Sequence, residues 1–379
     1  MAPTGDDVVF QYGAGGRGKG FGKDGRRLMS QPRGIHVESD GSLYVADFTS
    51  FCVFRFAAND SRGHVVAGED GKQLMDVDYM KDIDRPLASP EGEGFLLKNP
   101  IDVVSSPRDG LLVLDCAAAR VQSFQPGPGG QSAAGRVRVP PSTAPPAKSV
   151  AAPEALKHPR AIFLEDDGIV VCDTWSHRVL RYRTSASAPE VLAGTPNSCG
   201  GEPGKLNFPS CIAFCADGSL LVSDTNNHRV QRFRPGERQG ETVAGSAECK
   251  SGCSLTELNM PTGLVVEADG SFLVADRANG RVLRFREGGA GEVLAGPELL
   301  ERPWGLALGP DGSVYVSDER RAVVLKLAGA KPKQPKAEAA PPQPSGYPPQ
   351  MPAEEPSRGY PGKQPAAAPA APDLGMGLD

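Results

Sequence analysis

The sequence predicts an all-β protein, a six-bladed β-propeller followed by a disordered tail rich in Pro and Ala. The 46 glycines and 36 prolines among 379 residues are typical of many turns and short strands. A short apolar run that ends in Asp occurs six times, with similar residues around each copy. Four short antiparallel strands repeated every ~40 to 50 residues form a propeller blade, which needs neighbours on both sides to bury its faces.

The first two strands of each copy are a Pro-led apolar segment and the run that ends in Asp. The prolines are Pro32, Pro100, Pro159, Pro209, Pro261 and Pro303. The aspartates are Asp47, Asp115, Asp173, Asp224, Asp276 and Asp318. The distance from Pro to Asp is 14 or 15 residues in every copy, so we expect these two strands to keep one register.

A valine six residues after each Asp, with an apolar or aromatic residue three positions later, predicts the third strand. Most copies then close with a fourth strand such as EVLAG at 190–194, and the second copy has only the weaker SVAA, Ser149 to Ala152. The sixth copy ends near Leu327 after its third strand, while an apolar strand at 7–13 has no partner in its own neighbourhood. We expect this N-terminal strand to complete the last blade and close the ring.

The domain organisation follows from these repeats. The propeller is predicted to span residues 1–328, with insertion loops at 68–99 and 126–148, and the disordered tail to span 329–379. The insertions at 13–31, 68–99, 194–208 and 245–260 all connect one blade to the next. We therefore expect them on one face, here called the top face, together with the turns that follow each Asp. The segment 126–148 is expected between the third and fourth strands of blade two, on the opposite face.

The stretch GAGGRGKG, Gly13 to Gly20, is similar to a phosphate-binding P-loop, but Gly20 stands where that motif needs Ser or Thr. A P-loop must also open a helix, and here a strand follows. We interpret the stretch as a glycine-rich connection between blades. Its neighbourhood still supplies candidate contacts for an anionic partner. These are Arg17, Lys19, Lys23, Arg26 and Arg27.

The strand-ending Asp, the Arg-Val pair after it and the following aromatic residue resemble the NHL-repeat family of propellers. The fourth copy, FPSCIAFCADGSLLVSDTNNHRVQRF, is the closest match, and the resemblance covers about residues 7–328. It implies the propeller fold, but the family's functions differ widely: interaction propellers, RNA-binding propellers on ubiquitin-ligase modules, sensor domains of kinases and a zinc lyase. The first and sixth copies depart from the pattern, with Cys52 and Val323 in place of the repeat Arg.

The six aspartates are expected to be architectural, because six equivalent copies indicate a shared structural role. Each carboxylate would accept turn amides and the Arg five residues later. The predicted partners are Arg120, Arg178, Arg229 and Arg281.

No cofactor or metal is predicted. Only His36 and His158 of the five histidines fall near the propeller axis, too few for a three-histidine zinc site. The acidic loop DVDYMKDID, Asp76 to Asp84, lacks the central Gly and closing Glu of a calcium-binding EF-hand. Cys199, Cys249 and Cys253 lie in loops that join neighbouring blades; free thiols are favoured, and pairing or metal binding stays open.

The residue after each repeat Pro is expected at the top-face mouth of the central channel. These residues differ from blade to blade: Arg33, Ile101, Arg160, Ser210, Thr262 and Trp304. Two arginines and a tryptophan could recognise a peptide, an acidic side chain or a base. The alternative is that Trp304 packs between blades and both arginines are solvated.

We therefore predict a non-enzymatic interaction scaffold that binds a protein or peptide on its top face. RNA binding is the alternative, disfavoured by the net charge of -5, and a metal-dependent lyase or hydrolase in the channel is a third. The sequence shows neither a secretory signal nor a membrane span, so a cytoplasmic location is expected. The sequence leaves the oligomeric state open, with a monomer favoured.

Overall fold

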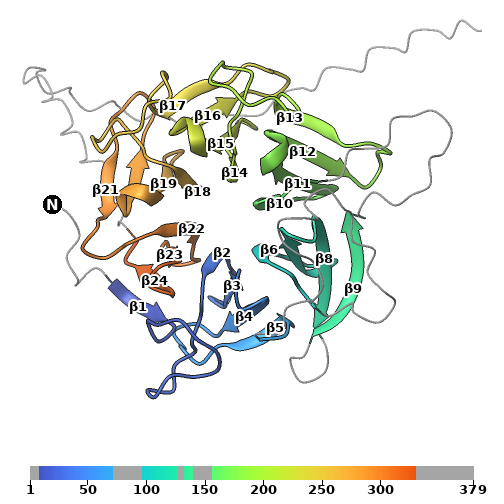
Figure 1. The fold of residues 1–379 in the computed structure, drawn as a ribbon, viewed down its shortest axis with the longest axis vertical. Coiled ribbons are helices and arrows are strands. Elements are labelled where there is room, and N and C mark those ends of the chain that lie inside the picture. The colour runs from blue at the N-terminus through green and yellow to red at the C-terminus, as the bar shows by residue number, and fades with distance from the viewer. Residues whose placement is uncertain (1–7, 71–95, 127–131, 140–155, 330–379) are drawn as a thin grey trace, which may run out of the picture. The chain divides into compact units, whose positions relative to one another are not determined.

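The computed structural model describes residues 8–70, 96–126, 132–139 and 156–329. These residues form six four-stranded antiparallel sheets arranged as a ring around a central channel (Figure 1). Along the chain, each sheet proceeds from the channel outward, so the strands that begin with the repeat Pro or just after it are innermost. No α-helix occurs in these ranges, and three single turns of 3-10 helix follow Asp173, Asp224 and Asp276. The predicted six-bladed propeller is confirmed.

Blades one to three contain strands β2 to β13. Their bounds are β2 (Pro32–Val37), β3 (Leu43–Asp47), β4 (Cys52–Phe56), β5 (His64–Gly68), β6 (Pro100–Ser106), β7 (Gly110–Asp115), β8 (Arg120–Pro126), β9 (Ser132–Val139), β10 (Ala161–Glu165), β11 (Gly168–Asp173), β12 (Arg178–Arg183) and β13 (Glu190–Gly194).

Blades four to six contain strands β14 to β24 and, in blade six, β1. Their bounds are β14 (Cys211–Phe214), β15 (Leu220–Asp224), β16 (Arg229–Phe233), β17 (Glu241–Gly245), β18 (Pro261–Val266), β19 (Phe272–Asp276), β20 (Arg281–Phe285), β21 (Glu292–Ala295), β22 (Pro303–Leu308), β23 (Val314–Asp318), β24 (Val323–Leu327) and β1 (Val8–Tyr12).

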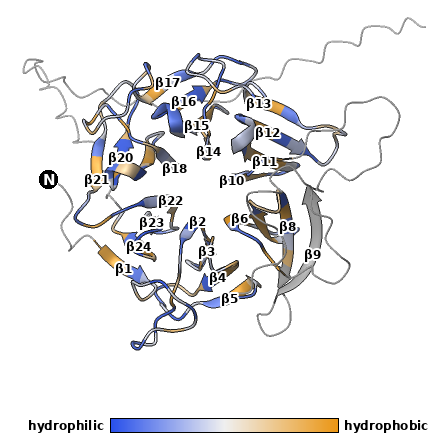
Figure 2. Cartoon of the chain, viewed as in Figure 1, coloured by the Kyte–Doolittle hydropathy of each residue, from blue (hydrophilic) through white to orange (hydrophobic). Residues whose placement is uncertain are grey.

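The N-terminal strand closes the ring, as the sequence predicts. β1 pairs with β24, with Gln11 opposite Leu325 and Tyr12 opposite Val324. Figure 2 shows β1 as largely hydrophobic and the connection from β1 to β2 as largely hydrophilic. The strand buries Tyr12 fully, leaves Val9 55% exposed, and covers an edge of β24 that would otherwise be open.

The core lies between blades rather than within one. Tyr12 and Tyr315 of blade six, for example, pack in one cluster with Val45 and Phe54 of blade one. Each blade thus buries its faces only against its neighbours, which is why the repeats fold as a ring.

The fourth strand of blade two corrects one prediction. It is β9, Ser132–Val139, and not Ser149 to Ala152. β9 pairs with β8 from Val121 opposite Val139 to Pro126 opposite Ser132, because the nearest strand along the chain takes the free edge of β8. Residues 132–139 of the predicted insertion loop 126–148 therefore form a strand of the blade.

The repeat aspartates hold the connection that enters each blade. Asp224 accepts the backbone N–H of Asn207 at 2.6 Å and Arg229 Nε at 2.9 Å. Arg229 and its equivalents pair with their aspartates at 2.7 to 3.4 Å in four blades. Asp47 has no such Arg and accepts the N–H groups of Ser30 and Gln31 instead. The top-face turns are fixed in this way, and the side chains beside them gain defined positions.

Candidate functional site

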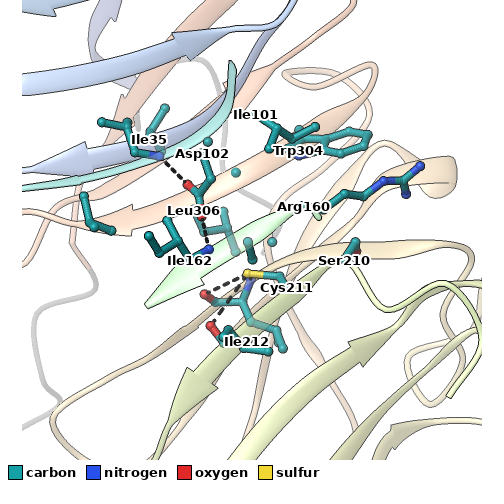
Figure 3. Close-up of a pocket in the computed structure, with 17 residues that line it drawn as sticks. Ile35, Ile101, Asp102, Arg160, Ile162, Ser210, Cys211, Ile212, Trp304 and Leu306 are labelled. Atoms are coloured by element: carbon teal, nitrogen blue, oxygen red, sulfur yellow. Dashed lines mark hydrogen bonds between the residues drawn. The ribbon is translucent and has the colours of Figure 1, made fainter. Parts of the chain in front are cut away.

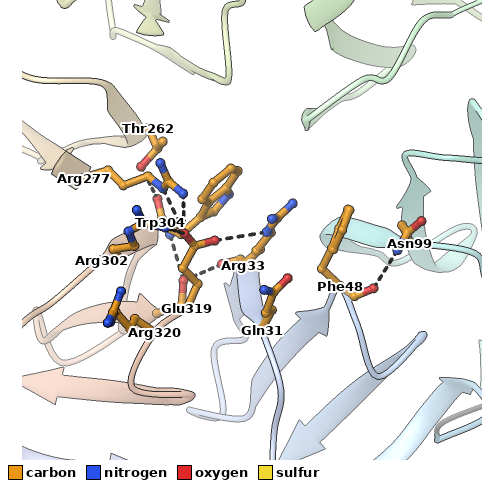
Figure 4. A network of polar contacts seen from close by, with 12 residues as sticks. Gln31, Arg33, Phe48, Asn99, Thr262, Arg277, Arg302, Trp304, Glu319 and Arg320 are labelled. Carbon is orange, nitrogen blue, oxygen red and sulfur yellow. Dashed lines mark hydrogen bonds and ion pairs between the residues drawn. The ribbon is translucent and has the colours of Figure 1, made fainter. Parts of the chain in front are cut away.

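The top-face mouth of the channel brings Arg33, Arg160 and Trp304 together. Figure 4 shows Arg33 and Trp304 at this mouth. Each directly follows a repeat Pro, so each stands where an innermost strand begins. Trp304 is 6% exposed and packs in a core cluster with Ile101, as the alternative reading of this residue expected.

Guanidinium groups cover the aromatic rings of this mouth. The guanidinium carbons of Arg33, Arg277 and Arg160 lie 4.3, 5.1 and 5.7 Å from the Trp304 ring centroid. Arg33 also lies 3.7 Å from the ring centroid of Phe48. Such contacts hold cations in place without neutralising them.

Within the described ranges, Glu319 is the carboxylate that contacts Arg33 and Arg277. Its Oε1 accepts Arg277 Nε at 3.1 Å, and its Oε2 lies 3.4 Å from Arg33 Nε. Burial lowers the pKa of Arg33 to about 10, against the opposing effect of Glu319, so Arg33 is charged at neutral pH. Three guanidinium groups therefore face one carboxylate, which leaves the mouth net positive.

Arg160 is the least constrained of the three cations. Its guanidinium forms neither a hydrogen bond nor an ion pair with the described residues and is held only over Trp304. Burial lowers the pKa of Arg160, because a partly desolvated charge without a contacting counter-ion is disfavoured. An anionic group that enters the mouth would relieve this cost.

Below the mouth lies a channel cavity of about 120 Å³ (Figure 3). Asp102 accepts the N–H groups of Val103 and Ile162, both at 2.9 Å, and Cys211 Sγ accepts the N–H of Leu264 at 3.3 Å. Burial raises the pKa of Asp102 to about 7 and that of the Cys211 thiol to about 12. Both side chains thus tie one blade to the next, and the thiol stays protonated.

The other residues expected at the mouth face inward. Ile101 is fully buried, Ser210 Oγ lies 2.6 Å from Thr225 Oγ1, and Thr262 Oγ1 donates to the Trp304 carbonyl at 3.0 Å. These contacts engage their polar groups within the protein. We accordingly centre the candidate site on Arg33, Arg160 and Trp304.

In the predicted cationic loop, some basic residues are engaged within the protein and others are exposed. Arg27 is buried, donates to Asp70 at 2.6 Å and lies 4.4 Å from the Phe54 ring centroid. Arg26 pairs locally with Asp24, whereas Arg17 is exposed on the top face. Lys19 and Lys23 lie in the same connection between β1 and β2.

In the described part of the chain, no group of three or more His, Cys, Asp or Glu side chains is arranged to hold a metal ion. His36 lies on β2, and His158 stacks 4.5 Å from the Trp175 ring centroid. Cys199, Cys249 and Cys253 are free thiols. The acidic loop Asp76 to Asp84 lies outside the described residues.

The comparison with known families now bears on this architecture. The NHL repeat model matches residues 206–233 and 258–285, which cover the first three strands of blades four and five. The chain is an NHL-repeat β-propeller. Within the ranges described for this NHL propeller, no helix has the length and apolarity needed to span a membrane.

Individual relatives are distant. Human teneurin-4 is 25% identical over 358 residues, which cover 83% of this chain and 12% of teneurin-4. A protein of unknown function from Bacteroides thetaiotaomicron has a TM-score of 0.56 at 14% identity, with 85% of this chain and 75% of that one aligned. A gluconolactonase from Xanthomonas campestris has a TM-score of 0.52 at 13% identity, with 80% and 88% aligned. These structures show a shared fold alone, and one of them is an enzyme.

Sequence reasoning missed Phe48, Arg277 and Glu319, and a usable pattern existed for all three. Each directly follows a repeat Asp, and this position differs between blades as strongly as the position after Pro does. In an NHL propeller both positions start or end an inner strand at the top face, so both sets point toward the channel mouth.

Proposed function

We propose that this NHL propeller is an interaction module that binds a protein partner through an acidic peptide segment docked at the top-face mouth. The observation that carries the proposal is the group of Arg33, Arg160 and Arg277 around Trp304 with one contacting carboxylate, Glu319. Carboxylates are the natural counter-ions, because they accept paired hydrogen bonds from guanidinium groups.

RNA is less well supported as the occupant. Proteins that bind single strands offer exposed aromatic rings on which bases stack. Here arginines already cover Trp304 and Phe48, and the chain as a whole carries a charge of -5. The channel mouth is positive while the chain as a whole is negative. This charge distribution favours binding of a short acidic segment over binding of a long polyanion.

Catalysis in the channel is also less well supported. Asp102 and Cys211 are the titratable side chains of its cavity besides Arg160, and backbone N–H groups engage both. A thiol whose burial raises its pKa to about 12 is a poor nucleophile at neutral pH. These observations favour binding as the role of the channel mouth.

The test is capture of partners from a lysate by the full chain, its Arg160→Gln variant and a control, Arg183→Gln, which alters an exposed arginine at the far end of β12. Loss of charge-assisted hydrogen bonds worth ~1.5 to 3 kcal/mol corresponds to a drop in affinity of about 10-fold to 100-fold. We expect proteins that resist nuclease, are displaced by a glutamate-rich peptide and are lost only from Arg160→Gln. Equal capture by all three would refute the site, and nuclease-sensitive capture would favour RNA.

A further inference from the structure

A second cavity on the top face adjoins the channel mouth. It has a volume of about 350 Å³ and is lined by Arg17, Gln31, Arg302, Glu319 and Arg320. The connection from β1 to β2 supplies Arg17 and Gln31, and blade six supplies the other three residues. Long-range pairing of the N-terminal strand with β24 therefore helps to place this cavity next to the mouth.

The cations of this cavity are accessible and incompletely neutralised. Arg302 is 49% exposed and lies 3.8 Å from Glu319, and Arg320 is 62% exposed and pairs with Glu301 at 2.9 Å. Arg17 is exposed, and its guanidinium forms neither a hydrogen bond nor an ion pair with any residue described. Three arginines thus share two carboxylates, one of which already serves the channel mouth.

Glu319 joins the two places. Its side chain is 5% exposed and lines the cavity. Its Oε1 contacts Arg277 and lies 3.8 Å from Arg302, and its Oε2 lies 3.4 Å from Arg33 (Figure 4). We call Arg33, Arg160 and Arg277 the inner half and Arg17, Arg302 and Arg320 the outer half. These six cations are matched by the contacting carboxylates Glu319 and Glu301, and Glu319 contacts cations of both halves.

We infer that the top face binds two anionic groups at once, one in each half, and that its ligand is a peptide with two acidic residues a few positions apart. The inference rests on the proposed function, which supplies the inner half. In an extended peptide, residues two to four positions apart are separated by roughly 7 to 13 Å, so one short segment can present two carboxylates to neighbouring groups of cations. Two planar carboxylates match two guanidinium clusters better than one point charge does.

The first test uses Gly/Ser peptides with no glutamate, one glutamate, or two glutamates separated by one, two or three residues. In the full chain with Trp175→Phe, Trp304 is the remaining tryptophan, so its emission reports occupancy of the inner half even for weak ligands. The outer-half variant is Arg17→Gln/Arg302→Gln. The matched control is Arg183→Gln/Arg286→Gln, which alters two exposed arginines whose strands end on the opposite face.

We expect the best two-glutamate peptide to bind about tenfold more tightly than the one-glutamate peptide, because one further charged contact is worth ~1.5 kcal/mol. The outer-half variant should lose this gain and keep its affinity for one glutamate, while Arg160→Gln should weaken both peptides. The control should bind as wild type does.

Other outcomes separate the two ideas. Equal affinity for one and two glutamates, with continued dependence on Arg160, overturns the two-group inference and leaves the proposed function standing. A lack of binding by every glutamate peptide overturns both. Peptides with phosphoserine in place of glutamate measure whether the two halves bind phosphoryl groups more tightly than carboxylates. Tighter binding of an oligouridylate than of any peptide would overturn the peptide inference and identify RNA as the ligand of the top face.

Discussion

Single residues in this propeller combine structural and electrostatic roles, and Asp102 shows how closely these are linked. Its carboxylate accepts backbone N–H groups from its own strand and from β10 of the next blade, yet it is buried in the wall of the channel cavity. Burial is the larger effect and raises its pKa from 3.8 to about 7. The folded protein therefore retains a proton that the unfolded chain releases.

This pKa shift predicts a pH-dependent stability. The folded state binds more protons than the unfolded state between pH ~4 and ~7. The contribution of Asp102 to the free energy of unfolding is therefore fully present below pH ~4 and is lost as the pH rises through ~7. Cys211, which faces the same cavity, stays neutral in this window because its pKa is about 12. We expect wild type to lose stability relative to Asp102→Asn from pH 4.5 to 7.5, measured by urea unfolding.

Asp311→Asn serves as the control for this measurement. A hydrogen bond from Lys326 lowers the pKa of Asp311 to about 2, so its contribution is lost only as pH falls below ~4. The difference between wild type and Asp311→Asn should thus stay constant from pH 4.5 to 7.5. A constant difference for Asp102→Asn as well would contradict a raised Asp102 pKa.

Among the elements of a blade, the turn after the second strand depends more on its Asp than on its Arg. Asp224 accepts the backbone N–H of Asn207, the Asn227 side chain and Arg229 Nε. Blades one and six lack the repeat Arg, and their aspartates still accept backbone N–H groups of the entering connection. Asp224→Ala leaves the 2% exposed Arg229 without its counter-ion. We expect a loss of ~3 to 5 kcal/mol in the free energy of unfolding.

Arg229→Ala should cost less, because Asp224 then keeps the Asn207 and Asn227 hydrogen bonds. Thermal or urea unfolding of the two variants measures the difference. If Arg229→Ala proves as harmful as Asp224→Ala, the ion pair, and not the capture of backbone amides, holds this turn.

Element prediction from sequence succeeded where residues recur and failed where they do not. Six copies of the Pro-to-Asp spacing gave the inner strands and their register, because one copy supports the next. β9 does not end like the other fourth strands, so its sequence, SAAGRVRV, carried no repeat and the SVAA segment was preferred. The position after Pro led to Arg33, Arg160 and Trp304. The neighbourhood of Arg17 with Arg302 and Arg320 was unpredictable, because it depends on how β1 brings the first connection beside blade six.

At the scale of the whole molecule, the ring is closed without a covalent link, by a strand from one end of the propeller and three from the other. Tyr12 of β1 is fully buried, its ring lies 5.6 Å from Phe56 of blade one, and its hydroxyl accepts the Asn59 N–H at 3.1 Å. The same ring lies 6.0 Å from Tyr315 of blade six. One side chain therefore joins the last blade to the first.

Ring closure through Tyr12 can be tested by urea unfolding. Tyr12→Ala removes a fully buried aromatic ring and should lower the free energy of unfolding by ~3 to 5 kcal/mol, whereas Tyr12→Phe removes one hydrogen bond and should cost ~1 kcal/mol. Phe21→Ala is the control, since Phe21 is 54% exposed in the connection that follows β1 and should change stability by no more than ~0.5 kcal/mol. If Tyr12→Ala unfolds at the same urea concentration as Phe21→Ala, β1 does not limit stability. If Tyr12→Ala unfolds at a much lower urea concentration than Phe21→Ala, β1 limits stability. Because the outer half of the top face depends on the same strand, Tyr12→Ala in sub-denaturing urea should then bind peptides with one and two glutamates equally well.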